Sequence, residues 1–296
     1  MSIIAKRRET RRVMYRGVPV GGRSPVTIQS MTTSRTADVR RVMREIRALA
    51  RAGCELVRVA VKDREDVAAL PALCTASPIP VIADVHFDWR LAVASARAGA
   101  AGLRINPGNI GNAEKVRRVV DAAADAGIPI RVGVNSGSIE RDLRALARKD
   151  PVRALCESAA RSVELIEGMG FRDIVVSLKS PDATATVEAN RAFAARGDYP
   201  LHIGVTEAGP ALSGAAKSAV ALALLLSEGI GDTVRVSLSG DPVREVTVAA
   251  AVLSALGLRD DIPRIVSCPT CGRSWIDVAR IAERLEREVM GLHIGG

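Results

Sequence analysis

The ten residues GLRINPGNIG, at positions 102–111, decide the fold, because aliphatic and polar side chains alternate there and then give way to a turn rich in Gly and Asn. Such a short run, bounded by Gly and Pro, predicts a β-strand over residues 102–107. The same signal recurs seven more times, at residues 25–31, 55–61, 80–85, 129–135, 173–179, 201–207 and 233–239.

Helical patterns fill the intervals between these strands, for example at residues 38–52, 88–98, 113–126, 151–169, 183–195 and 213–228. A TIM (β/α)8 barrel has eight strands that alternate with helices, and residues 25–256 match the roughly 250 residues of that fold. The sequence therefore predicts an α/β protein built on such a barrel, with a doubly wound sheet as the alternative.

Three regions are expected along the chain. Residues 1–24 form an N-terminal extension, residues 25–258 the barrel that binds the substrate, and residues 259–296 part of a further domain. Within the extension, residues 11–23 have the pattern of a hairpin with turns at Arg16-Gly17 and Gly21-Gly22. We expect this hairpin to plug the bottom of the barrel.

Composition excludes several classes of protein. Of the 296 residues 48% are hydrophobic, yet the longest apolar run, residues 219–226, is far shorter than the roughly 18 apolar residues of a membrane span. The basic residues 1–12 precede no apolar segment or cleavage site of a secretory signal. Five cysteines spread over the chain do not suggest a disulfide framework. We therefore expect a cytoplasmic protein with reduced thiols and no membrane contact.

An excess of basic residues is typical of nucleic-acid-binding proteins. The chain has 42 basic and 33 acidic residues, a net charge of +9, and 36 of the basic residues are Arg. Against this, only seven residues are Trp, Tyr or Phe, too few for base-stacking platforms, and no helix-turn-helix or zinc-finger spacing occurs. We expect no nucleic-acid partner; a smaller anion, or a compositional preference for Arg, explains the charge equally well.

Side-chain parity within the strands indicates what the barrel binds. Successive side chains of a strand point to opposite faces, and in residues 55–61 three valines share one face while Arg58 takes the other. The split repeats in later strands. If the aliphatic sets pack on the helices, the inward set comprises five cations, Arg58, Arg104, Arg131, Lys179 and Arg235, together with Asp84, His86, His202 and Ser237.

Five like charges inside a barrel require a neutralising partner, because an isolated buried ion is strongly unfavourable. Each Arg taken alone could pair with a surface acid. However, only Asp84 and Glu207 are expected near the same strand ends, so acids cannot satisfy the whole group. The hypothesis is that the mouth of the barrel binds a compact polyanion, most plausibly a diphosphate, through forked Arg contacts.

Three loops follow strands at the end where a TIM barrel carries its chemistry. Residues 106–111 and 135–138 contain Gly and Asn suited to presenting N–H groups to an anion, with ordinary turns as the alternative. Glu207, at the end of the seventh strand, is the candidate for proton transfer. A helix N-cap or an ion pair with one of the arginines is its structural alternative.

Two cysteines form the one compact thiol motif. Residues 264–267 are a candidate short strand leading into Cys268 and Cys271, and residues 275–290 follow as an amphipathic helix. This spacing suits half of a metal or iron–sulfur site, while a redox disulfide or half a zinc knuckle has the same pattern. The other cysteines, Cys54, Cys74 and Cys156, are expected to be buried and inert.

These residues together resemble the 4-hydroxy-3-methylbut-2-enyl diphosphate synthase family. The matching segments run in order from about residue 7 to 273: GVPVGG (17–22), VTIQSMT (26–32), AGCELVRVAV (52–61), ADVHFD (83–88), LRINPGNIG (103–111), VGVNSGS (132–138), VTEAG (205–209), EGIGDTVRVSL (228–238) and SCPTCGR (267–273).

The resemblance implies an iron–sulfur oxidoreductase of the non-mevalonate isoprenoid pathway that acts on 2-C-methyl-D-erythritol 2,4-cyclodiphosphate. It implies a TIM barrel, a 4Fe-4S cluster on a small α+β C-terminal domain, two electrons from ferredoxin or flavodoxin, and a head-to-tail homodimer. Glu207 would serve in acid–base chemistry, and Cys268 and Cys271 would ligate iron. The residues that would hold the diphosphate are Arg58, His86, Arg104, Asn106, Arg131, Asn135, Lys179 and Arg235.

The chain departs from the family pattern at its C-terminus. The family's third cluster Cys, and a Glu ligand, lie in a CVVNGPGE-like segment beyond the helix, whereas this sequence stops at GLHIGG (291–296), where His293 is no obvious substitute. We expect a truncated member of the family, with an incomplete cluster domain. The alternatives are a site completed by a separate chain, a cluster-free diphosphate-binding barrel, a metal-independent transferase of the pterin type, or a zinc-stabilised protein.

Overall fold

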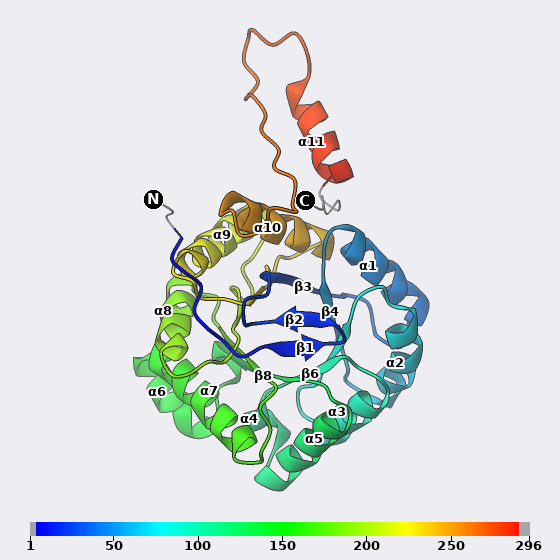
Figure 1. The fold of residues 1–296 in the computed structure, drawn as a ribbon, viewed down its shortest axis with the longest axis vertical. Coiled ribbons are helices and arrows are strands. Elements are labelled where there is room, and N and C mark those ends of the chain that lie inside the picture. Colours follow the sequence, from blue (N-terminus) through cyan, green and yellow to red (C-terminus); the bar gives the residue numbers. More distant parts are fainter. Residues whose placement is uncertain (1–3, 290–296) are drawn as a thin grey trace.

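A computed structural model describes residues 4–289 of the protein, and the centre of the fold is a closed ring of parallel strands (Figure 1). Neighbouring strands pair in the order β8-β7-β6-β5-β4-β3-β10-β9, and a parallel bridge between Val176 and Leu201 joins the two ends. The ring confirms the TIM barrel and excludes the doubly wound sheet. Its strands are β3 (Thr27–Met31), β4 (Leu56–Ala60), β5 (Val81–Asp84), β6 (Gly102–Ile105), β7 (Ile130–Asn135), β8 (Ile174–Lys179), β9 (His202–Ile203) and β10 (Thr233–Val234).

Helices surround the ring and bury its aliphatic outer face (Figure 1). Several begin at an Asp that accepts a backbone N–H of the first turn, as Asp38 does from Arg41 and Asp150 from Arg153. The helices of the barrel are α1 (Val39–Arg51), α2 (Arg64–Ala76), α3 (Trp89–Arg97), α4 (Pro107–Ile110), α5 (Ala113–Asp125), α6 (Arg144–Lys149), α7 (Pro151–Glu167), α8 (Ala183–Ala194), α9 (Ala211–Ser227) and α10 (Pro242–Ala255), with 3-10 turns at Ser136–Ser138 and Arg141–Leu143. None of the helices within residues 4–289 is long and apolar enough to cross a membrane.

The last two barrel strands are shorter than the seven residues predicted for each. β9 ends before Gly204, whose φ of +149° and close approach to the carbonyl of Arg235 leave no room for a Cβ. The chain turns again at Glu207, which has a φ of +51°. These bends stop the regular ladder, although Arg235 still donates its N–H to the carbonyl of Ile203 at 3.0 Å.

A hairpin closes the N-terminal end of the barrel, as predicted (Figure 1). Strands β1 (Val13–Tyr15) and β2 (Val18–Val20) pair antiparallel, and Arg16 and Gly17 both adopt the positive φ of a tight hairpin turn. The hairpin buries Val13, Tyr15 and Val20 against the first inward residues of the barrel strands, Leu56, Ile82 and Val175. We call these six residues the floor.

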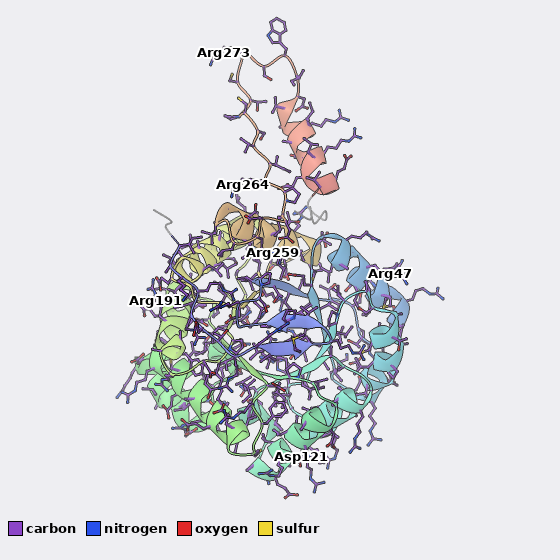
Figure 2. All side chains as sticks on the ribbon, viewed as in Figure 1. Arg47, Asp121, Arg191, Arg259, Arg264 and Arg273 are labelled. Atoms are coloured by element: carbon purple, nitrogen blue, oxygen red, sulfur yellow. The ribbon has the colours of Figure 1, made fainter. Side chains whose placement is uncertain are left out.

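Beyond α10 the chain forms an arm, residues 263–289, that projects from the barrel (Figure 1). Arg259 anchors its base by donating to the carbonyl of Val26 and to Glu55, while Arg273 lies near the far end (Figure 2). The strand predicted at residues 264–267 is absent, since no segment within residues 4–289 pairs with this largely exposed stretch. The predicted helix appears as α11 (Val278–Val289); residues 290–296, including His293, lie outside the described part.

Candidate functional site

The predicted cations meet inside the C-terminal mouth of the barrel. They line a cavity of about 190 Å³, which we call the mouth cavity. Strand pairing explains the convergence, because inward positions lie side by side: Asp84 pairs with Arg104, and Asn135 with Lys179. The lining includes eight residues predicted from the sequence, Arg58, His86, Arg104, Arg131, Asn135, Lys179, Arg235 and Ser237, and also Asp84.

Asp84 is the acid that holds two of these cations. Its Oδ2 lies 3.1 Å from Nε of Arg58, and its Oδ1 accepts from Nη1 of Arg104 at 3.2 Å. Burial works to raise the pKa of Asp84, but Arg58 and Arg104 lower it well below the usual range. His86 Nε2 lies 2.9 Å from Nη1 of Arg104, at the exposed rim. The carboxylate therefore neutralises one charge of the pair and fixes the direction of both guanidiniums.

Glu245 is a second acid at the mouth, and it was not predicted from the sequence. It is buried on α10, where it lies 3.4 Å from Nε of Arg235 and accepts from Ser30 at 3.0 Å. The expectation that Asp84 and Glu207 are the only nearby acids is therefore wrong. A carboxylate in the first turn of a largely apolar helix is the signal by which Glu245 could have been predicted.

Arg131 has no acidic partner among the described residues. Its side chain is 1% exposed, crosses the barrel and donates to Oε1 of Gln29 at 3.2 Å, and its buried Nε has no hydrogen-bond partner within residues 4–289. Burial and the nearby Arg104 lower its pKa to about 10. This guanidinium has unused donor capacity between the floor and the mouth cavity.

Lys179 and His202 are the remaining basic residues of the barrel interior. The Lys179 amine is buried, and burial together with Arg131 and Arg235 lowers its pKa well below the ordinary value. His202 lies deeper and does not line the mouth cavity. Its Nδ1 is 3.4 Å from Oγ1 of Thr233, its Nε2 is buried without a partner in the described part of the chain, and burial and Lys179 lower its pKa. The ring is therefore neutral at physiological pH.

Two further predicted residues do not line the mouth cavity. Asn106 caps α4, accepting the N–H of Gly108 at 3.1 Å and donating to the carbonyl of Ser138 at 3.2 Å. Because N–H groups of this loop bond to Asn106, it is an ordinary cap rather than an open anion cradle. Glu207 is exposed beside Thr206, which does line the cavity. Glu207 is neither a helix N-cap nor part of an ion pair, since the N-cap of α9 is Pro210 and no described cation pairs with Glu207.

Three further lining residues were not among the predicted binding residues: Met31, Ser177 and Thr206. The Met31 thioether lies 3.1 Å from Nη2 of Arg58 and 3.8 Å from Nη1 of Arg235. Parity places Ser177 inward beside Lys179, so its hydroxyl could have been found. Met31 could not be predicted in this way, because a Met in a strand is most simply interpreted as a core residue.

Cys268 and Cys271 lie together on the arm, away from the mouth cavity. Both are exposed and reduced, whereas Cys54, Cys74 and Cys156 are buried, as predicted. Backbone and side-chain hydrogen bonds with Arg273 lower the pKa of Cys271. Thiolates suit an iron–sulfur cluster, but no group of three His, Cys, Asp or Glu side chains in residues 4–289 is placed to hold a metal. The described donor set therefore fits part of a cluster site and not a whole one.

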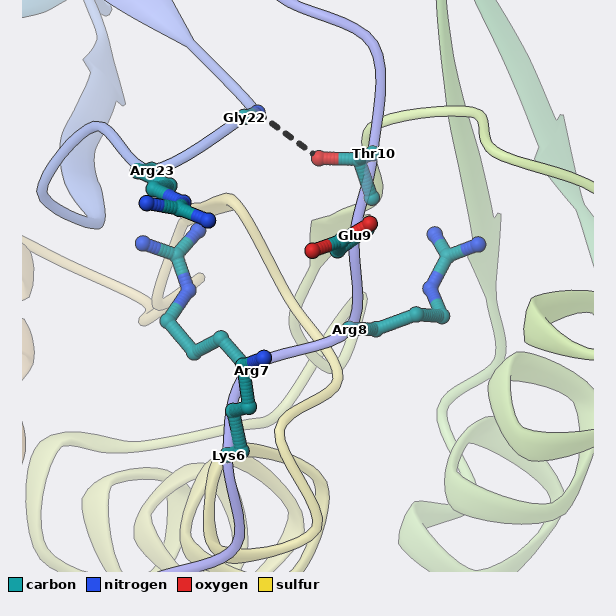
Figure 3. Close-up of a pocket in the computed structure, with 7 residues that line it drawn as sticks. All are labelled: Lys6, Arg7, Arg8, Glu9, Thr10, Gly22 and Arg23. Atoms are coloured by element: carbon teal, nitrogen blue, oxygen red, sulfur yellow. Dashed lines mark hydrogen bonds between the residues drawn. The ribbon is translucent and has the colours of Figure 1, made fainter.

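A larger hollow of about 500 Å³ lies at the opposite end of the barrel, against the N-terminal extension (Figure 3). Two of the four cations that line it already bind other parts of the chain. Arg7 donates to Asp232 at 2.8 Å, and Arg8, which extends to the other side of the segment, donates to the carbonyls of Ala194, Gly197 and Tyr199. These contacts tie the extension to the barrel, so the mouth cavity is the better candidate site.

Comparisons with known proteins agree with this geometry. Residues 10–250 match the GcpE TIM-barrel domain family. The 4-hydroxy-3-methylbut-2-en-1-yl diphosphate synthase (flavodoxin) of Salinispora tropica is 51% identical over 292 residues, 98% of this chain and 75% of the relative. Proteins of the same name from Desulfotalea psychrophila and Geobacter sulfurreducens are 50% and 49% identical over 97% and 96% of this chain and 79% and 80% of their own.

Solved structures share the fold at low identity. Dihydropteroate synthase of Yersinia pestis superposes with a TM-score of 0.59 at 13% identity, over 83% of this chain and 98% of that one. 3-Dehydroquinate dehydratase of Geobacillus kaustophilus gives 0.57 at 17% identity, over 88% and 100%. At such identity the likeness supports the barrel alone.

Proposed function

The chain belongs to the 4-hydroxy-3-methylbut-2-en-1-yl diphosphate synthase family, and from this premise we propose that its mouth cavity binds 2-C-methyl-D-erythritol 2,4-cyclodiphosphate. The protein is then an oxidoreductase of isoprenoid biosynthesis that forms 4-hydroxy-3-methylbut-2-enyl diphosphate. In the overall reaction two electrons and one proton enter, a carbon–oxygen bond of the cyclic diphosphate breaks, and a hydroxyl group leaves as water.

One observation carries this proposal: the mouth cavity has more cations than acids. Four guanidiniums meet two carboxylates, Asp84 and Glu245, which leaves an excess of two positive charges, and the amine of Lys179 is a further basic group. Arg131 and Lys179 have no acid at all within residues 4–289. Removing such charges from water is expensive, so the excess points to an anion that neutralises it when bound. A doubly negative cyclic diphosphate matches that need in sign and in magnitude.

The same side chains favour the chemical change. Guanidiniums contact phosphate oxygens through two parallel N–H donors, which fixes orientation as well as charge. When the ring opens, the freed phosphate oxygen gains negative charge close to these donors. Because the cations are held in place by Asp84, Glu245 and Gln29, they stabilise that charge without reorganising. Hydroxyls of Thr206 and Ser237 add neutral donors around the ligand, whereas the Ser177 hydroxyl donates to the carbonyl of Val132 at 3.3 Å.

The proton and the electrons are assigned to other residues. Glu207 stays the candidate for proton transfer, since it follows the cavity-lining Thr206 and its carboxylate is exposed at the mouth. A 4Fe-4S cluster supplies the electrons in this proposal, with Cys268 and Cys271 as two of its ligands. Flavodoxin, which the names of the relatives carry, is the electron donor we favour over ferredoxin. A cytoplasmic homodimer remains part of the proposal.

The binding step is tested by isothermal titration of 2-C-methyl-D-erythritol 2,4-cyclodiphosphate into the wild-type chain and Arg131→Met. We expect at least tenfold weaker binding by the variant, because hydrogen bonds from a charged donor contribute about 1.5–3 kcal/mol. Its free energy of unfolding should be unchanged or higher, since a buried unpaired charge is removed. Arg47→Met is the matched control, because Arg47 projects from the outer side of α1 (Figure 2). Equal affinity of all three proteins would contradict the proposal.

A cluster-free diphosphate-binding barrel is the second candidate, favoured by the incomplete donor set. Iron and acid-labile sulfide, measured after purification without oxygen, separate the two. We expect a cluster when a C-terminal segment carrying the family's third Cys is joined to residue 296. No cluster in the joined protein, with ligand binding intact, would favour the second candidate.

A further inference from the structure

We propose that the amine of Lys179 is neutral in the ligand-free protein and becomes ammonium when the cyclic diphosphate binds, so that each binding event takes up one proton from solution. This inference rests on the proposed function, because it takes the anion bound in the mouth cavity to be the diphosphate. Lys179 then changes its protonation state on binding, which a permanently charged phosphate-binding residue such as Arg would not do.

The position of Lys179 isolates its amine from acids. The residue is buried at the end of β8 and lines the mouth cavity, and its Nζ lies beside Gly204 of the neighbouring segment. Gly204 leaves only backbone on that side, and the ion pairs of residues 4–289 include none with Lys179. Of the six lysines in the chain, Lys179 is the buried one.

The groups that face Lys179 include four guanidiniums. Both carboxylates of the site are engaged by other residues, Asp84 by Arg58 and Arg104, and Glu245 by Arg235. The neutral His202 ring lies below and adds no negative charge. The charged and titratable groups around the amine are Arg58 on β4, Asp84 on β5, His86 after it, Arg104 on β6, Arg131 on β7, His202 on β9, Arg235 after β10 and Glu245 on α10.

Elementary electrostatics then gives the amine two states. Without an anion, an ammonium here is both desolvated and repelled by four guanidiniums, so the neutral form is favoured; the lowered pKa of Lys179 agrees with this. Two negative charges placed among the same groups cancel the excess of two guanidinium charges over the carboxylates and give an ammonium an anionic partner. The arginines cannot respond in this way, because guanidinium holds its proton more strongly than an amine does. Lys179 is therefore the group that absorbs the proton.

The test is calorimetric titration of 2-C-methyl-D-erythritol 2,4-cyclodiphosphate in buffers of different ionisation enthalpy. Each phosphorus of this ligand carries one strongly acidic oxygen and lacks the second ionisation of a phosphate monoester, so a proton taken up must come to the protein. Between pH 6 and 9 we expect a maximum approaching one proton per site, with affinity falling up to tenfold per pH unit as pH rises.

Variants assign the proton to a residue. Lys179→Met should bind the ligand more weakly and take up almost no proton, whereas His202→Asn and His86→Asn should keep the uptake, and Arg47→Met should match the wild type. If a variant does not fold, carbon-13 labelling of the lysine ε-carbon in the wild-type protein reports the amine directly. One resonance should move from the neutral to the ammonium position on addition of ligand.

The outcomes separate this inference from the proposed function. Absence of binding to the wild-type protein overturns the proposed function and this inference with it. Binding without proton uptake at any pH from 6 to 9 overturns the inference alone. Uptake that disappears in His202→Asn or His86→Asn and persists in Lys179→Met also overturns it, because the proton would then belong to an imidazole.

Discussion

The floor and the mouth cavity lie in the same strands and have opposite chemistry. On β4, Leu56 packs under the hairpin while Arg58, two residues on, pairs with Asp84; on β5, Ile82 and Asp84 divide in the same way. A displacement of two residues along a strand keeps the side chain inward and moves it one layer upward. The hydrophobic floor closes the barrel and stabilises it, whereas the mouth concentrates charge at the expense of stability. The pair Leu56 and Arg58 therefore separates stability from binding within one strand.

The largest expected effect is at the floor. Leu56→Ala leaves a cavity under the hairpin, and such substitutions cost about 2–5 kcal/mol of unfolding free energy. Urea denaturation followed by circular dichroism measures this loss. Affinity for the cyclic diphosphate in the folded protein should stay within a factor of about three, which corresponds to less than 1 kcal/mol. A large loss of affinity with little loss of stability would break the division between the two layers.

Arg58→Met is the partner experiment on the same strand. We expect binding of the cyclic diphosphate to weaken by about 2 kcal/mol, roughly 30-fold, because one charged donor is lost. Stability should change little, since Asp84 keeps its contact with Arg104 at 3.2 Å and one buried cation disappears. Titration calorimetry and urea denaturation, run on both β4 variants, give the two readouts. A destabilisation as large as that of Leu56→Ala would make Arg58 a structural residue.

Sequence reasoning predicted most of the mouth because strand parity is a local property. A period of two places Arg58, Arg104, Arg131 and Lys179 inward once the strands are recognised, whatever the barrel's exact dimensions. The hairpin was equally predictable, because Arg16-Gly17 supplies the positive φ values that its turn requires.

What parity could not predict depends on tertiary contact. Glu245 reaches Arg235 from a helix, and no strand pattern indicates that approach. The short β9 results from the packing of Gly204 against the backbone of Arg235, which is visible only in three dimensions. Asn106 has the right parity for the cavity but is drawn into capping α4. The arm lacks the strand expected at residues 264–267 because strand pairing needs a neighbour, and no segment of the described residues pairs with it.

Stability should also depend on pH through the mouth cavity. The pKa of Lys179 is lower in the folded protein than its unfolded value near 10.4, so the unfolded chain binds more protons between these two pKa values. Unfolding free energy therefore rises with pH in that window, by at most about 1.4 kcal/mol per pH unit, and the contribution is complete only above the unfolded pKa. Lys179→Met removes this rise.

The measurement is the difference in unfolding free energy between wild type and Lys179→Met from pH 7 to 9. Other titrating groups, including the buried Cys54 whose pKa is raised to about 12, contribute equally to both proteins and cancel. As the pH rises, the unfolding free energy of the wild type should increase relative to that of Lys179→Met. A difference that is constant over this range would mean that the amine does not change its charge on folding.

The smallest expected effect concerns Glu207, at the rim of the mouth. Its φ of +51° is unfavourable for a side chain with a Cβ, and its exposed carboxylate forms no hydrogen bond or ion pair with the described residues that would compensate. Glu207→Gly should therefore raise the unfolding free energy by up to about 1 kcal/mol. Glu207→Gln should leave stability unchanged, because it keeps the Cβ and the strain. Backbone strain at a residue that does not stabilise the fold is typical of a functional site. Both variants should therefore lose turnover in the cluster-loaded enzyme while they retain ligand affinity. If Glu207→Gly is destabilised instead, the carboxylate supports the loop, and the mouth is less sharply separated from the floor than the β4 pair implies.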